Sequence, residues 1–143
     1  MGEPKTIAIV CGGRTYGMAW RDDKDAVIEE RVALVDTLAA VAPNLIIHGA
    51  CVLSGEASGA DLIADMWASR NKVDAIRCPA PFAAFGRVAG PARNGGMLAL
   101  GQAMAKTLDA RLVVVAAPGG RGTASMVRLA KAAGVDVVEV KRG

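Results

Sequence analysis

Short apolar runs rich in β-branched residues alternate along this chain with longer segments whose apolar residues recur at helical spacing. This alternation predicts strands joined by crossover helices, an arrangement that builds a parallel sheet with helices on both faces. The sequence therefore predicts an α/β fold with a doubly wound, mostly parallel sheet. About five strands are expected, at 6–10, 44–48, 74–78, 111–117 and 135–140.

Four helices are expected between these strands. The first is capped by Asp25 and stopped by Pro43. The others are expected over 60–71, over 92–108 after an ordered loop at 79–91, and over 123–133 before Gly134. The apolar face of the first helix is expected to comprise Val27, Ile28, Val32, Leu34, Val35 and Leu38. That of the second helix is expected to comprise Leu62, Ile63, Met66 and Trp67.

The composition sets limits on the class of protein. A chain of 143 residues suits one domain, 1–143, and 52% hydrophobic residues with only 3% aromatic ones favour an aliphatic core. The net charge of +3 is spread along the chain without a basic run, so nucleic-acid binding is not favoured. The three cysteines follow no CxxC spacing, and no export leader or membrane segment is seen. We therefore expect a cytoplasmic protein that does not bind membranes.

Three glycine-rich loops occur where a predicted strand hands over to a helix. They are Gly12-Gly13-Arg14, the 54–59 segment SGEASG and the 118–123 segment PGGRGT. Glycine permits a close backbone approach, and the following helix offers free N–H groups to an anion. Because the carboxyl ends of parallel strands share one edge of a sheet, the loops are expected to meet there and to line one phosphate-binding pocket.

Arginines accompany these loops. Arg14, Arg87 and Arg121 lie in predicted exit loops, and Arg93 starts a predicted helix. A guanidinium can hold phosphate or carboxylate through two parallel hydrogen bonds. Taken singly, each arginine is as well explained as a solvated surface charge. The inference of anion binding therefore rests on their positions in or beside the strand exit loops.

Four ordered motifs resemble those of a known group of proteins. They are GGRTYG at 12–17, SGEASGAD at 54–61, FGRVAGPARNGGML at 85–98 and PGGRGT at 118–123. Together they resemble the SLOG superfamily, and within it the branch of small domains of poorly defined function related to YspA and YpsA. The resemblance implies a Rossmann-like strand order, with the first and fourth strands adjacent, and a nucleotide-derived ligand.

The loops and the resemblance together give a set of expected ligand-binding residues. The set comprises Gly12, Gly13, Arg14, Ser54, Gly55, Ser58, Gly59, Arg87, Arg93, Asn94, Pro118, Gly119, Gly120, Arg121, Gly122 and Thr123.

The sequence departs from the phosphoribohydrolases of the superfamily at a catalytic position. Those enzymes pair an arginine in a Met-x-x-Arg-Lys segment with the glutamate that ends Pro-Gly-Gly-x-Gly-Thr-x-x-Glu. Here Arg93 matches the arginine, but Asn94 follows it and Met126 stands at the glutamate position. The group that would stabilise an oxocarbenium ion or activate water is therefore missing. Glu56 or Asp61 replaces it only if the fold brings one of them near the ribose.

Three functions remain open. The first is binding or sensing of a phosphate-bearing, nucleotide-derived molecule resembling ADP-ribose or a nucleoside phosphate. The second is cleavage of the N-glycosidic bond of nucleoside monophosphates, with Arg93 and either Glu56 or Asp61 as catalytic residues. The third is single-stranded DNA binding of the DprA kind. Assembly into a homo-oligomer is also open.

Other candidate chemistry is weaker. His48 and the cysteines match no zinc-binding spacing, so neither a metal nor a resident cofactor is expected. Tyr16 and Trp20, in the loop after the first strand, either stack on a base or pack on their own domain.

Overall fold

The computed structural model describes residues 5–51, 57–80 and 89–141. Strands and helices alternate along these residues, as the sequence predicts, and all five strands join one sheet. The elements are β1 Thr6–Cys11, α1 Lys24–Val41, β2 Leu45–Cys51, α2 Ala60–Arg70, β3 Asp74–Ala80, α4 Ala89–Leu108, β4 Arg111–Ala116, α5 Arg121–Ala132 and β5 Asp136–Glu139.

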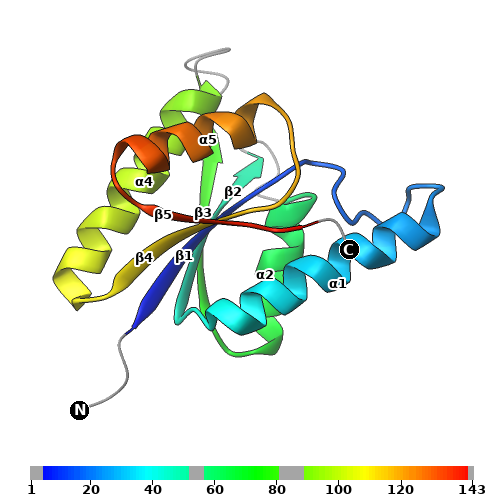
Figure 1. Ribbon diagram of the computed structural model, residues 1–143, viewed down its shortest axis with the longest axis horizontal. Helices are drawn as coiled ribbons and strands as arrows, with labels where there is room; N and C mark the ends of the chain where they lie inside the picture. The colour runs from blue at the N-terminus through cyan, green and yellow to red at the C-terminus, as the bar shows by residue number, and fades with distance from the viewer. Residues whose placement is uncertain (1–4, 52–56, 81–88, 142–143) are drawn as a thin grey trace.

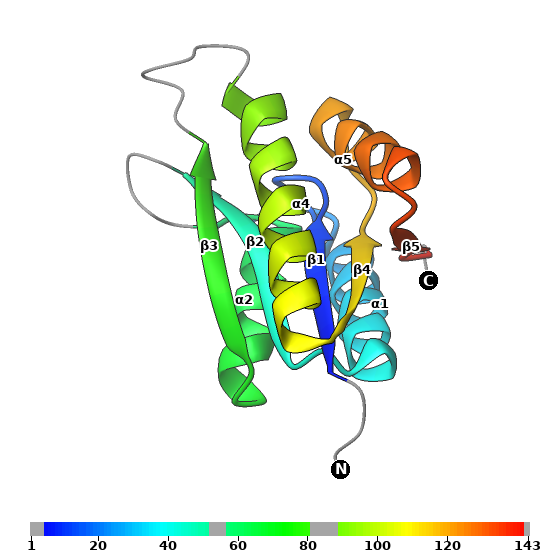
Figure 2. The same ribbon diagram turned by 90° about the vertical axis from the view of Figure 1, so that its left-hand side faces the viewer.

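The strand order is β3-β2-β1-β4-β5, and every neighbouring pair is parallel. The order confirms the predicted Rossmann-like arrangement with the first and fourth strands adjacent. Figure 2 shows the strands side by side, with their carboxyl ends along one edge. The chain reverses its direction of winding between β1 and β4, and such a point is where open α/β sheets bind ligands.

Helices cover both faces of the sheet. α1 and α2 lie against one face, and α4 and α5 lie against the other (Figures 1 and 2). Side chains alternate along β1, so Ala8 and Val10 join the core under α1 and α2, while Ile7 and Ile9 join the core under α4 and α5. None of the helices in the described ranges is long and apolar enough to cross a membrane.

The cap of α1 differs from the prediction. Asp23, rather than Asp25, caps the helix, because its side chain accepts a hydrogen bond from the N–H of Ala26 at 3.2 Å. Asp25 instead lies in the first turn, where its charge suits the positive end of the helix dipole. The helix ends at Val41, two residues before the proline that was predicted to stop it.

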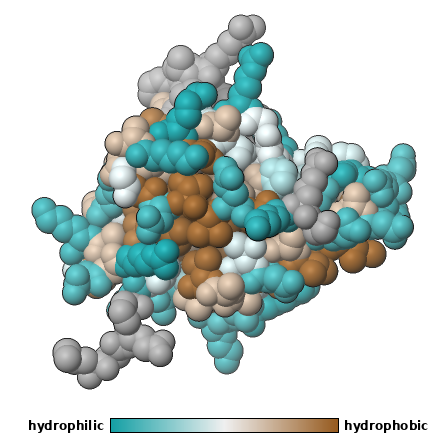
Figure 3. Space-filling view, viewed as in Figure 1, coloured by the Kyte–Doolittle hydropathy of each residue, from teal (hydrophilic) through white to brown (hydrophobic). Residues whose placement is uncertain are grey.

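The predicted apolar face of α1 is only half right. The buried residues are Val27, Leu34 and Leu38, whereas Ile28, Val32 and Val35 are 59%, 52% and 38% exposed. The six positions span more of the helix circumference than one sheet face can cover, so half of them point to solvent. Hydrophobic residues are visible over α1 at the lower right of Figure 3. The same correction applies to Met66 of α2, which is 36% exposed.

Several element boundaries also differ. α4 starts at Ala89, before Pro91, because proline is tolerated in a first helical turn, where its missing N–H is not needed. β2 continues to Cys51, and β3 continues through Pro79. A proline is accommodated there because β3 is an edge strand, which can leave one backbone position unpaired.

Candidate functional site

The loops that follow β1 and β4 are in direct contact. The N–H of Gly13 donates to the carbonyl of Pro118 at 2.9 Å, and the N–H of Ala117 donates to the carbonyl of Cys11 at 2.9 Å. A Cβ atom on Gly119 would lie 2.7 Å from the backbone nitrogen of Gly13. This close approach therefore requires glycine at position 119.

The start of α2 packs into the same place. The N–H of Ala60 donates to the carbonyl of Gly13 at 3.2 Å. Gly59 has a φ of 60°, and a Cβ atom there would lie 2.6 Å from the carbonyl carbon of Arg14. A Cβ atom on Gly12 would lie 2.5 Å from the side chain of Ala60. Two predicted glycine loops and the start of α2 thus converge at the carboxyl edge of the sheet.

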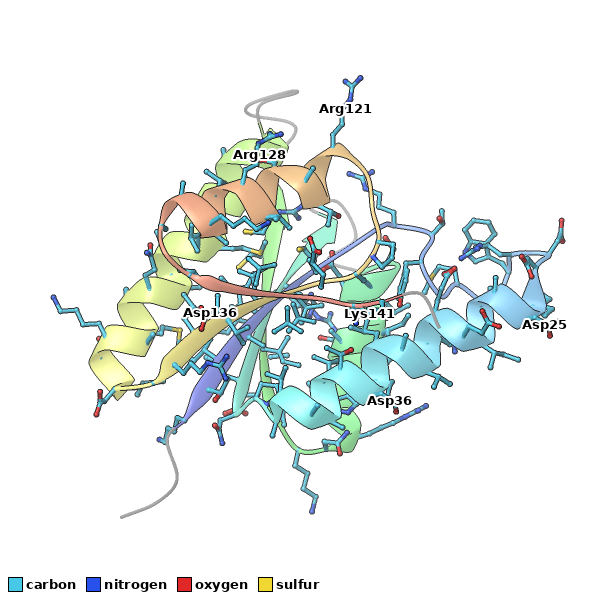
Figure 4. The ribbon with its side chains drawn as sticks, in the orientation of Figure 1. Asp25, Asp36, Arg121, Arg128, Asp136 and Lys141 are labelled. Carbon is cyan, nitrogen blue, oxygen red and sulfur yellow. The ribbon has the colours of Figure 1, made fainter. Side chains whose placement is uncertain are left out.

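The first turn of α5 faces this edge without a cap. Gly120 is its N-cap residue, and no side chain of the described residues accepts a capping hydrogen bond. The first turn carries no acidic residue, in contrast to α1, which has both an aspartate cap and an aspartate in its first turn. Arg121 extends outward from this end of α5 in Figure 4. The orphan N–H groups of α5 and its positive dipole end suit an anion.

Arg93 reaches the same edge from α4. Its guanidinium lies against Gly49 of β2, where a Cβ atom would fall 2.9 Å from Cζ of the arginine. Gly49 is paired with Cys78 of β3, and the register of β1 places Cys11 on its other side. The absent side chain at Gly49 therefore opens a space in a row of side chains, and the guanidinium fills that space.

The cysteines on either side of this space are poor nucleophiles. Burial raises the pKa of the Cys11 thiol to about 12, despite the opposing effect of Arg93. Burial also raises the pKa of Cys78. Both thiols are free and protonated at neutral pH, so they contribute packing rather than chemistry. No cluster of three or more potential metal-ligating side chains occurs in the described ranges.

Asp61, in the first turn of α2, lies beside Arg93. Its Oδ2 atom is 3.2 Å from the position that a Cβ atom on Gly49 would take, a point that the guanidinium also contacts. Burial raises the pKa of Asp61 to about 6, while His48, Arg93 and a hydrogen bond from the N–H of Gly49 act in the opposite direction. A carboxyl group with this pKa exchanges protons near neutral pH.

A buried histidine, His48, lies near the Asp61–Arg93 pair. His48 is fully buried; its Nε2 is 2.8 Å from Oδ1 of Asp65, and its Nδ1 is 2.7 Å from the carbonyl oxygen of Gly49. Both ring nitrogens of His48 therefore have a polar partner within the protein. Arg77 donates to the other oxygen of Asp65 at 2.7 Å, and this bond, followed by that from His48, lowers the pKa of Asp65. His48 thus connects β2 to Asp65 of α2.

Asn94 joins α4 to α5. Its side chain is buried, donates to the carbonyl of Gly122 at 3.1 Å, and accepts from Nε of Arg93 at 3.3 Å. Asn94 therefore orients Arg93 relative to the first turn of α5. Position 126, where the related hydrolases have a glutamate, holds a methionine that is fully buried in the core under α4 and α5.

The remainder of the β1–α1 loop is tied to α1. The hydroxyl of Tyr16 donates to the carbonyl of Glu30 at 2.7 Å, and the carboxylate of Glu30 accepts from the N–H of Gly17 at 2.6 Å and from Arg21 at 2.5 Å. Tyr16 is buried, so it packs on its own domain, whereas Trp20 is exposed.

A cavity of about 500 Å³ opens beside the uncapped end of α5, between this helix and the end of β5. Gly119, Gly120 and Thr123 line it, together with Glu139 of β5. Neither Asp61 nor Arg93 is among its lining residues.

The structure places most of the expected ligand-binding residues along the carboxyl edge of the sheet. Ser58 is exposed just before α2, and Arg14 is exposed at the end of the first glycine loop. Gly49, Asp65 and Arg77 could not be expected from the sequence, because none of them belongs to a local motif. Four expected residues lie outside the described residues, namely Ser54, Gly55, Glu56 and Arg87.

A comparison with protein families matches residues 6–85 to the YspA, cpYpsA-related SLOG family. The chain belongs to this SLOG family. The match covers β1, α1, β2, α2 and β3, and therefore includes Gly12, Gly13, Gly59 and Asp61. Arg93 and the glycine loop before α5 lie beyond the matched residues. A comparison with curated proteins finds no match.

Proposed function

We propose that this SLOG protein binds a phosphate-bearing, nucleotide-derived small molecule, with the phosphate over the glycine loops that follow β1 and β4. The observation that carries the proposal is the first turn of α5, which has neither a side-chain cap among the described residues nor an acidic residue. Helix N–H groups in this position need an acceptor, and a phosphate oxygen supplies one.

The neighbouring groups support an anionic ligand. Gly119 and Gly120 are exposed, and glycine has no side chain that would keep a ligand away from their backbone. Arg121 extends from the first turn of α5, and Arg93 adds a positive charge on the β2 side of the same edge. Arginine is well suited to phosphate because its planar fork makes two parallel hydrogen bonds.

A variant at Gly120 tests the phosphate site without disturbing the fold. A Cβ atom on Gly120 meets no other atom within 4 Å, so a side chain is accommodated there. Gly120→Asp supplies a carboxylate cap that occupies the N–H groups and repels phosphate. Titration calorimetry with AMP should show at least about a tenfold loss of affinity for this variant, because a charge-assisted phosphate contact is lost.

Gly120→Ala is the matched control, because it adds a Cβ atom without a charge. It should bind AMP within about threefold of the wild type, since it loses no phosphate contact. The Gly120→Asp variant should unfold at the same temperature as the wild type or a few degrees higher, because aspartate is a good N-cap residue. Equal AMP affinity in Gly120→Asp and Gly120→Ala would reject the proposed phosphate site.

A second candidate function is hydrolysis of the N-glycosidic bond of nucleoside monophosphates. The apposition of Asp61 and Arg93 favours it, because a carboxyl group with a pKa of about 6 can move a proton beside a cation. Against it, the glutamate position of the related hydrolases holds the buried Met126. We therefore expect binding with little or no turnover.

The two functions are separated by measuring release of free base from AMP. The binding function predicts no release above the uncatalysed rate. Rapid release that Asp61→Asn and Arg93→Ala both abolish would instead establish the hydrolase, with Asp61 in place of the missing glutamate.

A further inference from the structure

An apolar stripe on α1 is exposed to solvent. Ile28, Val32 and Val35 are 59%, 52% and 38% exposed, and Ala39 is exposed as well. The four positions recur at alternating intervals of four and three residues, which is the spacing of the apolar seam between two paired helices. Hydrophobic residues are visible over α1 at the lower right of Figure 3. Single exposed apolar side chains are ordinary, but a continuous row of them indicates an interaction surface.

The two flanks of this stripe carry opposite charges. Because an α-helix has 3.6 residues per turn, Lys24 and Arg31 lie along one flank, and Glu29 and Asp36 lie along the other. Asp25 adds to the acidic flank, and Figure 4 shows Asp25 and Asp36 on α1. The stripe is therefore bounded by positive charge on one side and by negative charge on the other.

This division of charge favours a second copy of the chain as the partner, in a parallel orientation. When two identical helices pair in parallel about a two-fold axis, the basic flank of each faces the acidic flank of the other. In such a pair, a residue on one flank faces the residue five positions further along the other helix. Five positions separate Lys24 from Glu29, and also Arg31 from Asp36. In an antiparallel pair the two acidic flanks would instead face each other and repel.

The same charges argue against a lipid surface as the partner. Helices that lie on membranes are rich in Lys and Arg on their polar face, because these residues are attracted to anionic lipids. α1 has four acidic residues against two basic ones, Lys24 and Arg31. Anionic headgroups would repel this helix, whereas pairing of two copies brings each charged flank against its complement.

We propose that two copies of this chain associate through parallel α1 helices, stripe against stripe, with Lys24 of each copy facing Glu29 of the other and Arg31 facing Asp36. The proposal is independent of the proposed phosphate site, because none of these residues belongs to the glycine loops or to α5. One helix from each copy makes a contact at the small end of specific interfaces, so we expect a dissociation constant on the order of 100 µM.

Sedimentation velocity of the purified protein from about 10 to about 500 µM tests the association. The average mass of the wild type should rise with concentration from that of one chain toward that of two. Val32→Glu places a charge in the middle of the stripe and should weaken association at least about tenfold. Ala40→Glu is the matched control, because Ala40 is exposed on α1 outside the stripe, and it should change the dissociation constant by less than about threefold.

Charge reversal tests the parallel orientation. Lys24→Glu and Glu29→Lys should each weaken self-association about tenfold, because each variant places like charges against each other twice in the dimer. An equimolar mixture of the two variants should associate within about threefold of the wild type, since every reversed charge then faces an opposite one. Circular dichroism of each variant checks that the fold is retained.

Three results would overturn the proposal. The first is a wild type that stays monomeric up to about 500 µM, or a Val32→Glu variant that associates as well as the wild type. The second is stronger self-association of Glu29→Lys, because the new lysine gains an opposite charge only in an antiparallel pair, where it faces Asp36. The third is monomeric protein that co-sediments with phosphatidylglycerol vesicles in a manner that Val32→Glu abolishes, which would assign the stripe to a lipid surface.

Discussion

Replacing Asp61 by asparagine should stabilise the protein at neutral pH. Burial raises the pKa of Asp61 from 3.8 to about 6, so ionisation of this carboxyl group costs the folded state free energy relative to the unfolded chain. One pKa unit corresponds to about 1.4 kcal/mol, so the cost at pH 7 is roughly 3 kcal/mol. Asparagine has the same shape and no charge, and it can still accept the hydrogen bond from the N–H of Gly49.

The effect has a defined pH dependence. Between pH 4 and pH 6 the folded wild type retains the proton on Asp61 while the unfolded chain has lost it, so the stability of the wild type falls as pH rises through this window. Asp61→Asn lacks this dependence. The difference in free energy of unfolding between the two proteins should therefore grow from near zero at pH 4 to roughly 3 kcal/mol at pH 7.

Urea unfolding followed by circular dichroism at pH 4, 5, 6 and 7 measures this difference. Asp36→Asn is the control, because Asp36 is exposed on α1, and it should follow the wild type at every pH. An Asp61→Asn variant that is less stable than the wild type at pH 7 would be the opposite of the expected result. That result would mean that Arg93 and His48 fully compensate the burial of the carboxylate.

Three other substitutions have expected outcomes. Gly49→Ala should displace the guanidinium of Arg93 and lower the free energy of unfolding in urea by about 1–3 kcal/mol. As a control, Gly95→Ala in α4, where a Cβ atom meets nothing within 4 Å, should raise the free energy of unfolding by up to about 1 kcal/mol. Met126→Glu should lower the free energy of unfolding by about 3 kcal/mol or more, because it buries a charge, while Met126→Leu should lower it by less than about 1.5 kcal/mol. A Met126→Glu protein that is stable and releases base from AMP would contradict this expectation. Tyr16→Phe removes a hydroxyl that donates to a carbonyl of α1 and should lower the unfolding free energy by about 1 kcal/mol, so an unchanged value would show that this bond contributes nothing.

The order of the elements could be predicted because each strand is a short β-branched run that ends near glycine or proline. The strand that contains Val113–Val115 illustrates this, since its unbroken apolar run predicts a strand buried on both faces, as observed. The buried face of α1 could not be predicted as well. Its sequence contains two overlapping apolar stripes, and only packing on the sheet selects the one with Leu34 and Leu38.

The candidate site was predictable where its residues belong to loops. Glycines after buried strands indicate a ligand edge in any parallel sheet, so Gly12, Gly13, Gly119 and Gly120 could be found from their positions alone. The apposition of Asp61 and Arg93 could not be found in this way. Asp61 lies in the first turn of α2 and Arg93 in the second turn of α4, on opposite faces of the sheet, and both contact the space that Gly49 leaves open.

We propose above that a phosphate-bearing ligand binds at the glycine loops and the first turn of α5. Titration of ¹⁵N-labelled protein with AMP, followed by amide nuclear magnetic resonance, tests it most directly because each backbone N–H reports separately. Binding at this site should give saturable shifts that are largest for the amides of residues 12–14 and 119–123, with little change along the exposed face of α1. Absence of saturable shifts at 119–123, or larger shifts elsewhere in the chain, would contradict it.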